Sequence, residues 1–399
     1  MSDQNPLFIP GPTNIPEKLR RAFDVPSMDH RSEKFAAMLK PLADGVKDVL
    51  KTRTGEVVMF PGSGTGGWEA SITNTLSPGD KILSARYGMF SHRWIDLCQR
   101  HGLDVEVIEE EWGNGAPADR FEEVLTADKG HEIKAVLATH NETATGVRSD
   151  IGAIRKALDA AKHPALLFVD GVSSIASMDF RMDEWGVDLA VTGSQKGFML
   201  PTGAAIVGVS QKALKAMETA RCPRCYFDFR DMLGSNANGG YPYTPPLNIL
   251  SALKVSLEML QEEGLPNVFA RHHRIAEGIR TAVGAWGLKI CANNPRLYSE
   301  TVTAICVPHG FDSNAVVSHA ADKYGVAFGV GLGEVAGKVF RIGHLGSMTD
   351  VMALSGIAAA EMVMADLDYP IKLGSGVAAA QEYYRNTRHV GSVDATRAA

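Results

Sequence analysis

The stretch Val57-Val58-Met59-Phe60-Pro61-Gly62-Ser63-Gly64-Thr65-Gly66-Gly67 decides the fold that we predict. Its first four residues form an apolar run typical of a buried strand, and a helical pattern begins near Trp68. The small residues between them let backbone N–H groups approach an anion, and the helix N-terminus adds a partial positive charge. We therefore expect a phosphate site at this turn. A plain glycine-rich connection is the alternative.

The same turn also matches a dinucleotide-binding pattern. Gly62, Gly64 and Gly67 have the GxGxxG spacing between a strand and a helix. That pattern requires an acidic residue about 20 positions further on, at the end of the second strand, to bind the ribose. The second strand ends with Ala85-Arg86-Tyr87 and has no carboxylate there, whereas Asp80 lies at its start. A phosphate site remains the prediction, and a dinucleotide is not required.

Strands and helices alternate over the first half of the chain, which indicates an α/β domain with a mainly parallel sheet. The expected strands are 57–60, 81–85, 105–109, 135–140, 165–170, 189–193 and 204–209, with helices over 68–76, 91–101 and 151–161. After residue 245 the pattern becomes that of a smaller α+β domain, with helices over 248–263, 267–286, 313–324 and 350–366 and strands over 299–307 and 338–342. We expect an N-terminal arm (1–17), a large domain (18–265) and a small C-terminal domain (266–399), whose polar tail after Leu373 is partly mobile.

Composition excludes several classes of protein. The 399 residues carry 40 Lys and Arg against 46 Asp and Glu, a net charge of −6 that argues against nucleic-acid binding. No apolar stretch approaches the roughly 20 residues that span a bilayer, and the N-terminus lacks the layout of a secretory signal. Five cysteines cannot all pair, so a disulfide framework is not expected. We predict a cytoplasmic globular protein.

Two residues at strand ends indicate the chemistry. Asp170 follows the apolar run Phe168-Val169 and Lys196 follows the strand 189–193, so both belong to the edge where ligands bind in open α/β sheets. Considered separately, Asp170 would be interpreted as a residue that caps the following segment, and Lys196 as an ordinary surface lysine. Together with the phosphate turn they meet the three needs of pyridoxal phosphate: a lysine for a Schiff base, an acid for the ring nitrogen and a phosphate cradle.

Motifs along nearly the whole chain resemble those of one family. They are Pro10-Gly11-Pro12-Thr13-Asn14, Gly62-Ser63-Gly64-Thr65-Gly66, Thr139-His140-Asn141-Glu142-Thr143, Gly193-Ser194-Gln195-Lys196, Tyr241-Pro242-Tyr243-Thr244-Pro245 and Phe340-Arg341-Ile342-Gly343. In order and spacing they resemble the class V (fold-type I) pyridoxal-phosphate aminotransferases, most closely the alanine/serine–glyoxylate branch. The resemblance implies a seven-stranded sheet between helices, a smaller C-terminal domain and a homodimer with shared active sites.

The resemblance also implies roles for individual residues. Lys196 would form the Schiff base and shuttle the proton, while Asp170 would keep the ring nitrogen protonated. Thr143 would bind the phenolic oxygen, and Phe90 would stack on the ring where relatives often have tryptophan. Arg341 would bind the substrate α-carboxylate as a bidentate fork. The phosphate would be bound by Ser63, Gly64 and Thr65 with Gln195 beside them, and by Tyr241 and Thr244 of a partner subunit.

The implied reaction moves an amino group from serine or aspartate, with alanine as a third candidate, to glyoxylate. An aspartate donor needs a second cation for its distal carboxylate, and Arg31 and Arg224 are the candidates. A pyridoxal-phosphate lyase such as a cysteine desulfurase stays open as an alternative, but it needs a mobile cysteine, and Cys291 and Cys306 lie in or beside apolar segments. A nicotinamide oxidoreductase leaves Lys196 unexplained. No metal site is expected, because the CxxC of residues 222–225 has no second pair.

Overall fold

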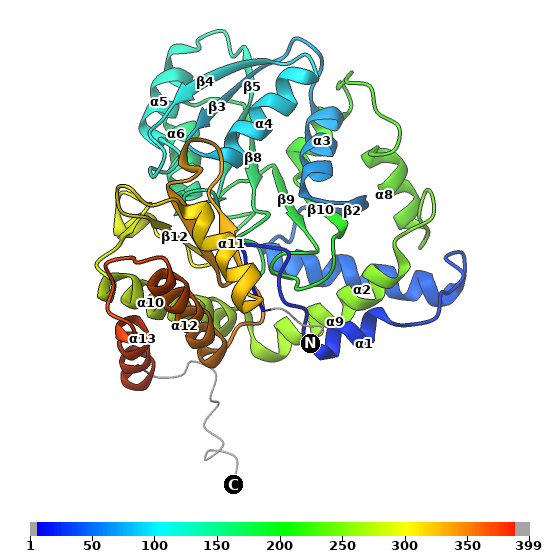
Figure 1. Cartoon of the computed structure of the whole chain (residues 1–399). Coiled ribbons are helices and arrows are strands. Elements are labelled where there is room, and N and C mark those ends of the chain that lie inside the picture. The colour runs from blue at the N-terminus through cyan, green and yellow to red at the C-terminus, as the bar shows by residue number, and fades with distance from the viewer. Residues whose placement is uncertain (1–5, 388–399) are drawn as a thin grey trace.

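A seven-stranded sheet forms the centre of the larger part of the molecule in a computed structural model that describes residues 6–387 (Figure 1). Every neighbouring pair of its strands is parallel except the two pairs that include β10. The order is β2 (Glu56–Gly62), β10 (Gly203–Val209), β9 (Leu189–Gly193), β8 (Leu166–Asp170), β5 (Ile133–Thr139), β3 (Lys81–Arg86) and β4 (Asp104–Glu109). The prediction of a mainly parallel seven-stranded sheet is confirmed.

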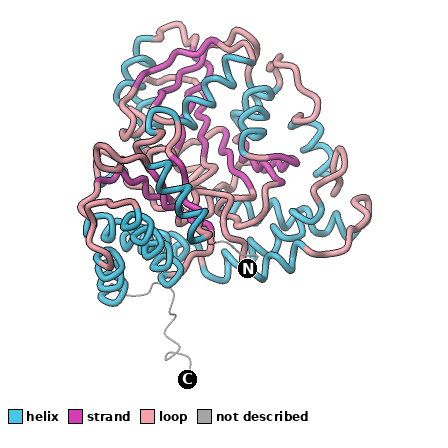
Figure 2. The backbone as a smooth tube through the Cα atoms, in the orientation of Figure 1, coloured by secondary structure: helices cyan, strands magenta, loops and turns pink. Residues whose placement is uncertain are grey.

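Helices cover both faces of this sheet, because successive strand residues point to opposite sides. Val57 and Met59 join one core cluster with residues of α2 and α9, whereas Val58 and Phe60 join another beneath α3 and α4. Figure 2 shows the strands running between these helical layers. The helices are α1 (Glu17–Phe23), α2 (Glu33–Leu50), α3 (Gly64–Thr75), α4 (Met89–Arg100), α5 (Ala118–Ala127), α6 (Ile151–Ala160), α7 (Gln211–Met217), α8 (Phe229–Ala237) and α9 (Leu247–Glu263). The sequence pattern did not predict α2, because this helix contains Pro41 and proline usually interrupts a helix.

A second sheet and four helices form the smaller part. The sheet order is β1 (Leu7–Phe8), β13 (Ala327–Val330), β14 (Val339–Gly343), β12 (Val302–Cys306) and β11 (Lys289–Ile290). Its helices are α10 (Leu265–Ala285), α11 (Ser313–Tyr324), α12 (Asp350–Asp366) and α13 (Ser375–Asn386). The α+β pattern predicted here is confirmed, while the domain boundaries stay a prediction.

Part of the segment after Leu373 is a helix that the sequence pattern did not predict, because α13 packs on α10 and α12. Glu361, which is 2% exposed, anchors it. Its carboxylate accepts hydrogen bonds from the Trp286 indole (2.8 Å) and from the backbone N–H groups of Gly374 (2.9 Å) and Gly376 (2.5 Å). The buried carboxylate therefore attaches the start of α13 to the core. The amino-acid composition of the segment does not show that this contact exists. Residues 388–399 lie outside the described part.

Another carboxylate, Asp128, fixes the entry to β5. It accepts hydrogen bonds from the N–H groups of Glu132 (3.1 Å) and Ile133 (2.8 Å), and lies 3.1 Å from Nε2 of His163. Burial raises the pKa of Asp128, but these donors outweigh it, so the pKa lies below the usual value. Asp128 is therefore ionised, and bound, at neutral pH.

The N-terminal strand β1 leaves the large part and pairs in parallel with β13. From there residues 9–13 cross back to the large part, where the N–H of Thr13 donates to the Gln195 carbonyl at 3.3 Å. The arm therefore runs between the two sheets rather than along the surface. Within residues 6–387, none of the helices is long and apolar enough to cross a membrane. The cytoplasmic location stays a prediction.

Candidate active site

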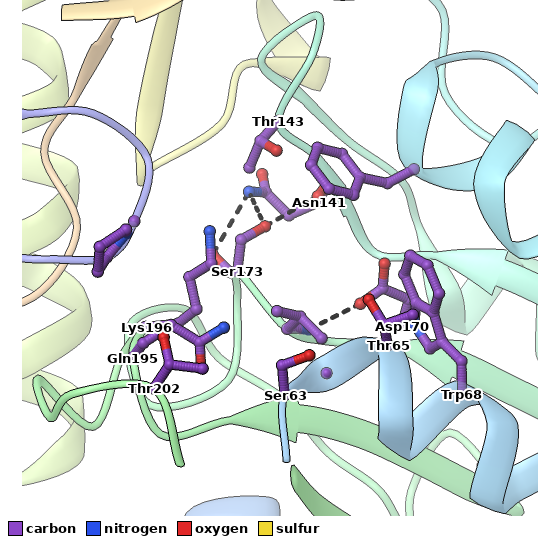
Figure 3. Close-up of a pocket in the computed structure, with 15 residues that line it drawn as sticks. Ser63, Thr65, Trp68, Asn141, Thr143, Asp170, Ser173, Gln195, Lys196 and Thr202 are labelled. Carbon is purple, nitrogen blue, oxygen red and sulfur yellow. Dashed lines mark hydrogen bonds between the residues drawn. The ribbon is translucent and has the colours of Figure 1, made fainter. Parts of the chain in front are cut away.

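A cavity of about 250 Å³ lies at the carboxyl ends of β5, β8 and β9, beside the start of α3 (Figure 3). The parallel strands carry their terminal residues to this one edge, as expected for an open α/β sheet. Predicted site residues from five separate stretches of the chain line the cavity: Ser63, Gly64, Thr65, Phe90, Thr143, Asp170, Gln195 and Lys196. Three predicted site residues, Tyr241, Thr244 and Arg341, are not among its lining residues.

The start of α3 forms one end of the cavity. Ser63 precedes the helix in an extended conformation and its side chain makes no capping hydrogen bond, so its hydroxyl remains available. The first turn contains no acidic residue, which leaves the positive end of the helix dipole uncompensated. A Cβ at Gly64 would collide with the side chain of Val172, so glycine is required for this close approach. This end suits a phosphate group.

Asp170 lies at the end of β8 and is 4% exposed. Its Oδ1 accepts a hydrogen bond from the N–H of Val172 at 2.9 Å, which orients the carboxylate. Burial raises the pKa of Asp170 to about 7, and the nearby Glu142 adds to the effect, while Val172 and Lys196 oppose it. A cationic N–H placed against this carboxylate would favour its ionised form.

Lys196 lies across the cavity from Asp170 (Figure 3), in the turn that follows β9. Ser194 holds this turn, because its hydroxyl donates to the Pro201 carbonyl (2.7 Å) and accepts from the N–H of Ala204 (3.1 Å). Burial lowers the pKa of Lys196 to about 8, helped by the charge of Arg341 and opposed by that of Asp170. A substantial share of the amine is therefore neutral, and nucleophilic, near neutral pH.

The N-terminal arm closes over Lys196. The amine donates a hydrogen bond to the carbonyl of Pro10, and Gly11 and Pro12 line the cavity. A Cβ at Gly11 would lie 2.5 Å from Nζ of Lys196. The sequence singled out Pro10-Gly11-Pro12 only as part of a resemblance, because nothing local connects it with a lysine 186 positions away.

A second missed group surrounds Asn141, at the end of β5. Its Nδ2 donates to the hydroxyls of Ser173 (2.8 Å) and Thr301 (2.9 Å), and both Asn141 and Ser173 line the cavity (Figure 3). The Oδ1 of Asn141 is buried and has no hydrogen-bond partner among the described residues. Its place after an apolar strand, two residues before Thr143, is a signal that sequence analysis could have used.

Arg341, on β14, is buried at the edge of the site. Its Nε donates to the carbonyl of Val330 at 2.8 Å and an Nη donates to the carbonyl of Thr143 at 2.9 Å. Burial lowers the pKa of Arg341 to about 10, Glu142 opposes this and Arg93 adds to it. Two backbone carbonyls therefore orient the guanidinium, and no described carboxylate forms an ion pair with it.

Tyr241 and Thr244 lie apart from the cavity of their own chain. The hydroxyl of Tyr241 donates to the carbonyl of Met59, and its ring packs against Phe35 and Tyr243. Thr244 is exposed. Their predicted role, which requires a second subunit, is not tested by one chain.

Arg224 is not available for a substrate. Its guanidinium binds Asp228 at 3.1 Å and the carbonyls of Thr73 (2.9 Å) and Cys222 (3.2 Å). It is therefore already occupied by structural contacts. The other candidate, Arg31, is exposed in the loop before α2 and is not a lining residue of the cavity.

The polar groups of the cavity fit pyridoxal phosphate. They comprise the free N–H groups at the start of α3, a carboxylate that favours a cationic N–H, and a partly neutral amine. The phosphate, the ring nitrogen and the aldehyde are the matching groups of that cofactor. None of the residues that line the cavity is a cysteine, so the nucleophile of a desulfurase is missing from this chain's pocket.

Comparisons with known proteins agree with this geometry. The family model described as Aminotransferase class-V matches residues 19–342. The chain is 71% identical to the L-aspartate–glyoxylate aminotransferase of Paracoccus denitrificans, covering 97% of this chain and 98% of that one. It is 56% identical to the serine–glyoxylate aminotransferase of Hyphomicrobium methylovorum, with 95% and 94% coverage. Among solved structures, the alanine–glyoxylate aminotransferase of a Nostoc species superposes with a TM-score of 0.85 at 30% identity, covering 91% of this chain and 96% of that one.

Proposed function

This chain belongs to the class V aminotransferases, and we propose that it transfers the amino group of L-aspartate to glyoxylate, which yields glycine and oxaloacetate. The observation that carries the chemistry is that Lys196, Asp170 and the start of α3 meet around one cavity. The donor rests on the 71% identity with an L-aspartate–glyoxylate enzyme, against 56% with a serine–glyoxylate enzyme. Serine is therefore the second donor to compare.

The cofactor of the family is pyridoxal phosphate, which supplies an aldehyde for amino groups and a ring that withdraws electrons from the donor's α-carbon. We propose that Ser63, Thr65 and the N–H groups of α3 bind its phosphate, with Gln195 beside them. Asp170 pairs with the ring nitrogen, and Phe90 stacks on the ring. Thr143 binds the phenolic oxygen, to which its hydroxyl can donate a hydrogen bond.

Lys196 then has two tasks. Its amine would hold the cofactor between turnovers. Once free, it would take the proton from the donor's α-carbon and deliver it to the carbon of the cofactor that carries the amino group. The lowered pKa suits both tasks, because a neutral amine is required at the start of each. Arg341 binds the α-carboxylate, and its carbonyl-held guanidinium fixes the donor's orientation, which is what brings the α-hydrogen to Lys196.

We propose a homodimer with shared sites. Tyr241 and Thr244 do not line their own chain's cavity, and Thr244 is exposed, which suits contact with the phosphate of a second subunit. Sedimentation of the protein tests the dimer. A mixture of Lys196→Ala and Tyr241→Phe chains tests the sharing, since mixed dimers should recover a site that neither variant alone possesses.

The donor proposal is tested by measuring kcat/KM for aspartate, serine and alanine with glyoxylate as acceptor, with Lys196→Ala as the blank. Aspartate should have the highest value. A spectrum before and after borohydride addition tests the cofactor separately, because reduction fixes it to Lys196. If aspartate gives no turnover while serine does, the donor proposal is wrong and the cofactor assignment stands.

A further inference from the structure

Arg93 is an exposed cation that the proposed mechanism does not use; it does not line the cavity itself but contacts a residue that does. It lies on α4 one turn after Phe90, and its Cζ is 5.5 Å from the centroid of the Phe90 ring. Phe90 itself lines the cavity. An aromatic face holds a guanidinium flat against it and leaves the N–H fork directed outward.

The charge of Arg93 is not neutralised within the described chain. Arg93 is exposed, and none of the ion pairs among residues 6–387 includes it. Its neighbours differ in this respect: Arg100, on the same helix, binds Asp96 at 2.9 Å, and Arg86 binds Glu109. An arginine that lies beside a ligand cavity and has no carboxylate partner can use its five N–H donors to bind a ligand.

Arg93 also acts on Arg341. Its charge is one of the causes that lower the pKa of Arg341, after burial. The two guanidinium groups are thus close enough to repel each other, and a monocarboxylate bound to Arg341 neutralises only one of the two cations. A molecule with two carboxylates neutralises both cations.

We propose that Arg93 binds the distal carboxylate of a dicarboxylic amino donor while Arg341 binds its α-carboxylate. The inference rests on the aminotransferase function proposed above and assigns its donor class to a residue. Serine has no distal carboxylate to pair with Arg93, so the residue distinguishes dicarboxylic donors from neutral ones. Arg224 is excluded by its structural contacts, and Arg31 is the rival.

The first test compares donors in Arg93→Met, which keeps an unbranched apolar stem like that of arginine and removes the charged guanidinium. The ratio of kcat/KM for aspartate to that for serine should fall about 10- to 100-fold, the range expected for lost hydrogen bonds to a charged group. The fall should appear mainly in the KM for aspartate. Arg93→Lys keeps the charge but not the two-pronged geometry of the guanidinium donors, so its donor ratio should lie between those of the wild type and Arg93→Met. Arg100→Met is the matched control on the same helix and should leave the ratio as in the wild type.

The second test does not depend on turnover. Calorimetry of the holoenzyme with succinate, which has both carboxylates and no amino group, should show binding that weakens by at least tenfold in Arg93→Met. Propionate, with one carboxylate, should not discriminate between the two proteins. An unchanged donor ratio or unchanged succinate affinity in Arg93→Met overturns the proposal. So does a loss of aspartate preference in Arg31→Met but not in Arg93→Met.

The two proposals fail in different ways. A wild-type enzyme that binds succinate through Arg93 but does not use aspartate would overturn the aspartate–glyoxylate function and leave the dicarboxylate site standing. A wild-type enzyme that uses aspartate with no contribution from Arg93 would do the opposite. Circular dichroism and serine turnover by Arg93→Met establish that the variant is folded, so a lost aspartate preference cannot be attributed to unfolding.

Discussion

Replacing Gly11 by alanine should displace the active-site lysine without unfolding the protein. Gly11 has a φ of 110°, and a Cβ there would lie 2.5 Å from both Cδ and Nζ of Lys196. Non-bonded carbon atoms rest about 3.5 Å apart or more, so the arm or the lysine must move by about 1 Å. The lysine side chain is flexible whereas the arm is held at β1 and Thr13, so the lysine is the group that moves.

Two costs follow, and they differ in kind. A non-glycine residue at this positive φ costs about 1–3 kcal/mol of unfolding free energy. A displacement of about 1 Å at a reacting group costs on the order of 100-fold in rate, which corresponds to roughly 2.7 kcal/mol in the activation free energy. Stability should therefore fall modestly while kcat falls strongly.

The assay measures kcat at saturating donor and the free energy of unfolding in urea for two variants. Gly310→Ala is the matched control, because Gly310 also has a positive φ (92°) but no atom lies within 4 Å of an added Cβ. Gly310→Ala should lose similar stability and keep the wild-type kcat. If Gly11→Ala keeps its kcat within threefold of the wild type, the arm does not position Lys196 and the reasoning fails.

Three further predictions concern buried charges. Glu361→Gln should lower the free energy of unfolding by about 1–3 kcal/mol and remove hydrogen-exchange protection from α13, whereas Glu382→Gln, at an exposed site of α13, should do neither. The pKa of Asp128 is lowered in the folded protein, so its carboxylate should contribute about 1.5–3 kcal/mol to the free energy of unfolding above pH ~4. This contribution should be lost as the pH falls through the folded pKa. A difference in unfolding free energy between wild type and Asp128→Asn that stays constant from pH 7 to pH 3 would contradict this prediction. Capture of pyridoxal phosphate by the apoprotein, followed by absorbance, should accelerate with rising pH and have its midpoint at about pH 8, because the neutral amine of Lys196 reacts and its pKa is about 8. Arg341→Met should move this midpoint to higher pH, and a shift to lower pH would contradict the influence of Arg341 on Lys196.

Local sequence patterns were sufficient for the large sheet. Its central strands are short apolar runs whose residues are buried on both faces, whereas the edge strand β4 alternates apolar and acidic residues. Because parallel strands deliver their carboxyl ends to one edge, the positions of Asp170, Lys196 and the Ser63–Thr65 turn at strand ends were enough to assign them to one site. Their functional roles remain predictions.

The sequence pattern did not predict α13. This helix is held in place by the buried carboxylate of Glu361, which accepts hydrogen bonds from backbone N–H groups at its start. Polar composition predicts exposure only when no partner is present to bind the polar groups, and that partner comes from another helix.

The alternation of strands and helices, the position of the catalytic candidates and the family all followed from the sequence, because they depend on periodicity and on spacing along the chain. Three other features could not be predicted from the sequence. They are the closure of the Pro10–Gly11 arm over Lys196, the orientation of Arg341 by the carbonyls of Val330 and Thr143, and the position of Arg93 beside the site. Most of these contacts join residues far apart in the chain. They exist only because the two parts of the molecule pack together, and no local pattern records how surfaces from distant segments meet.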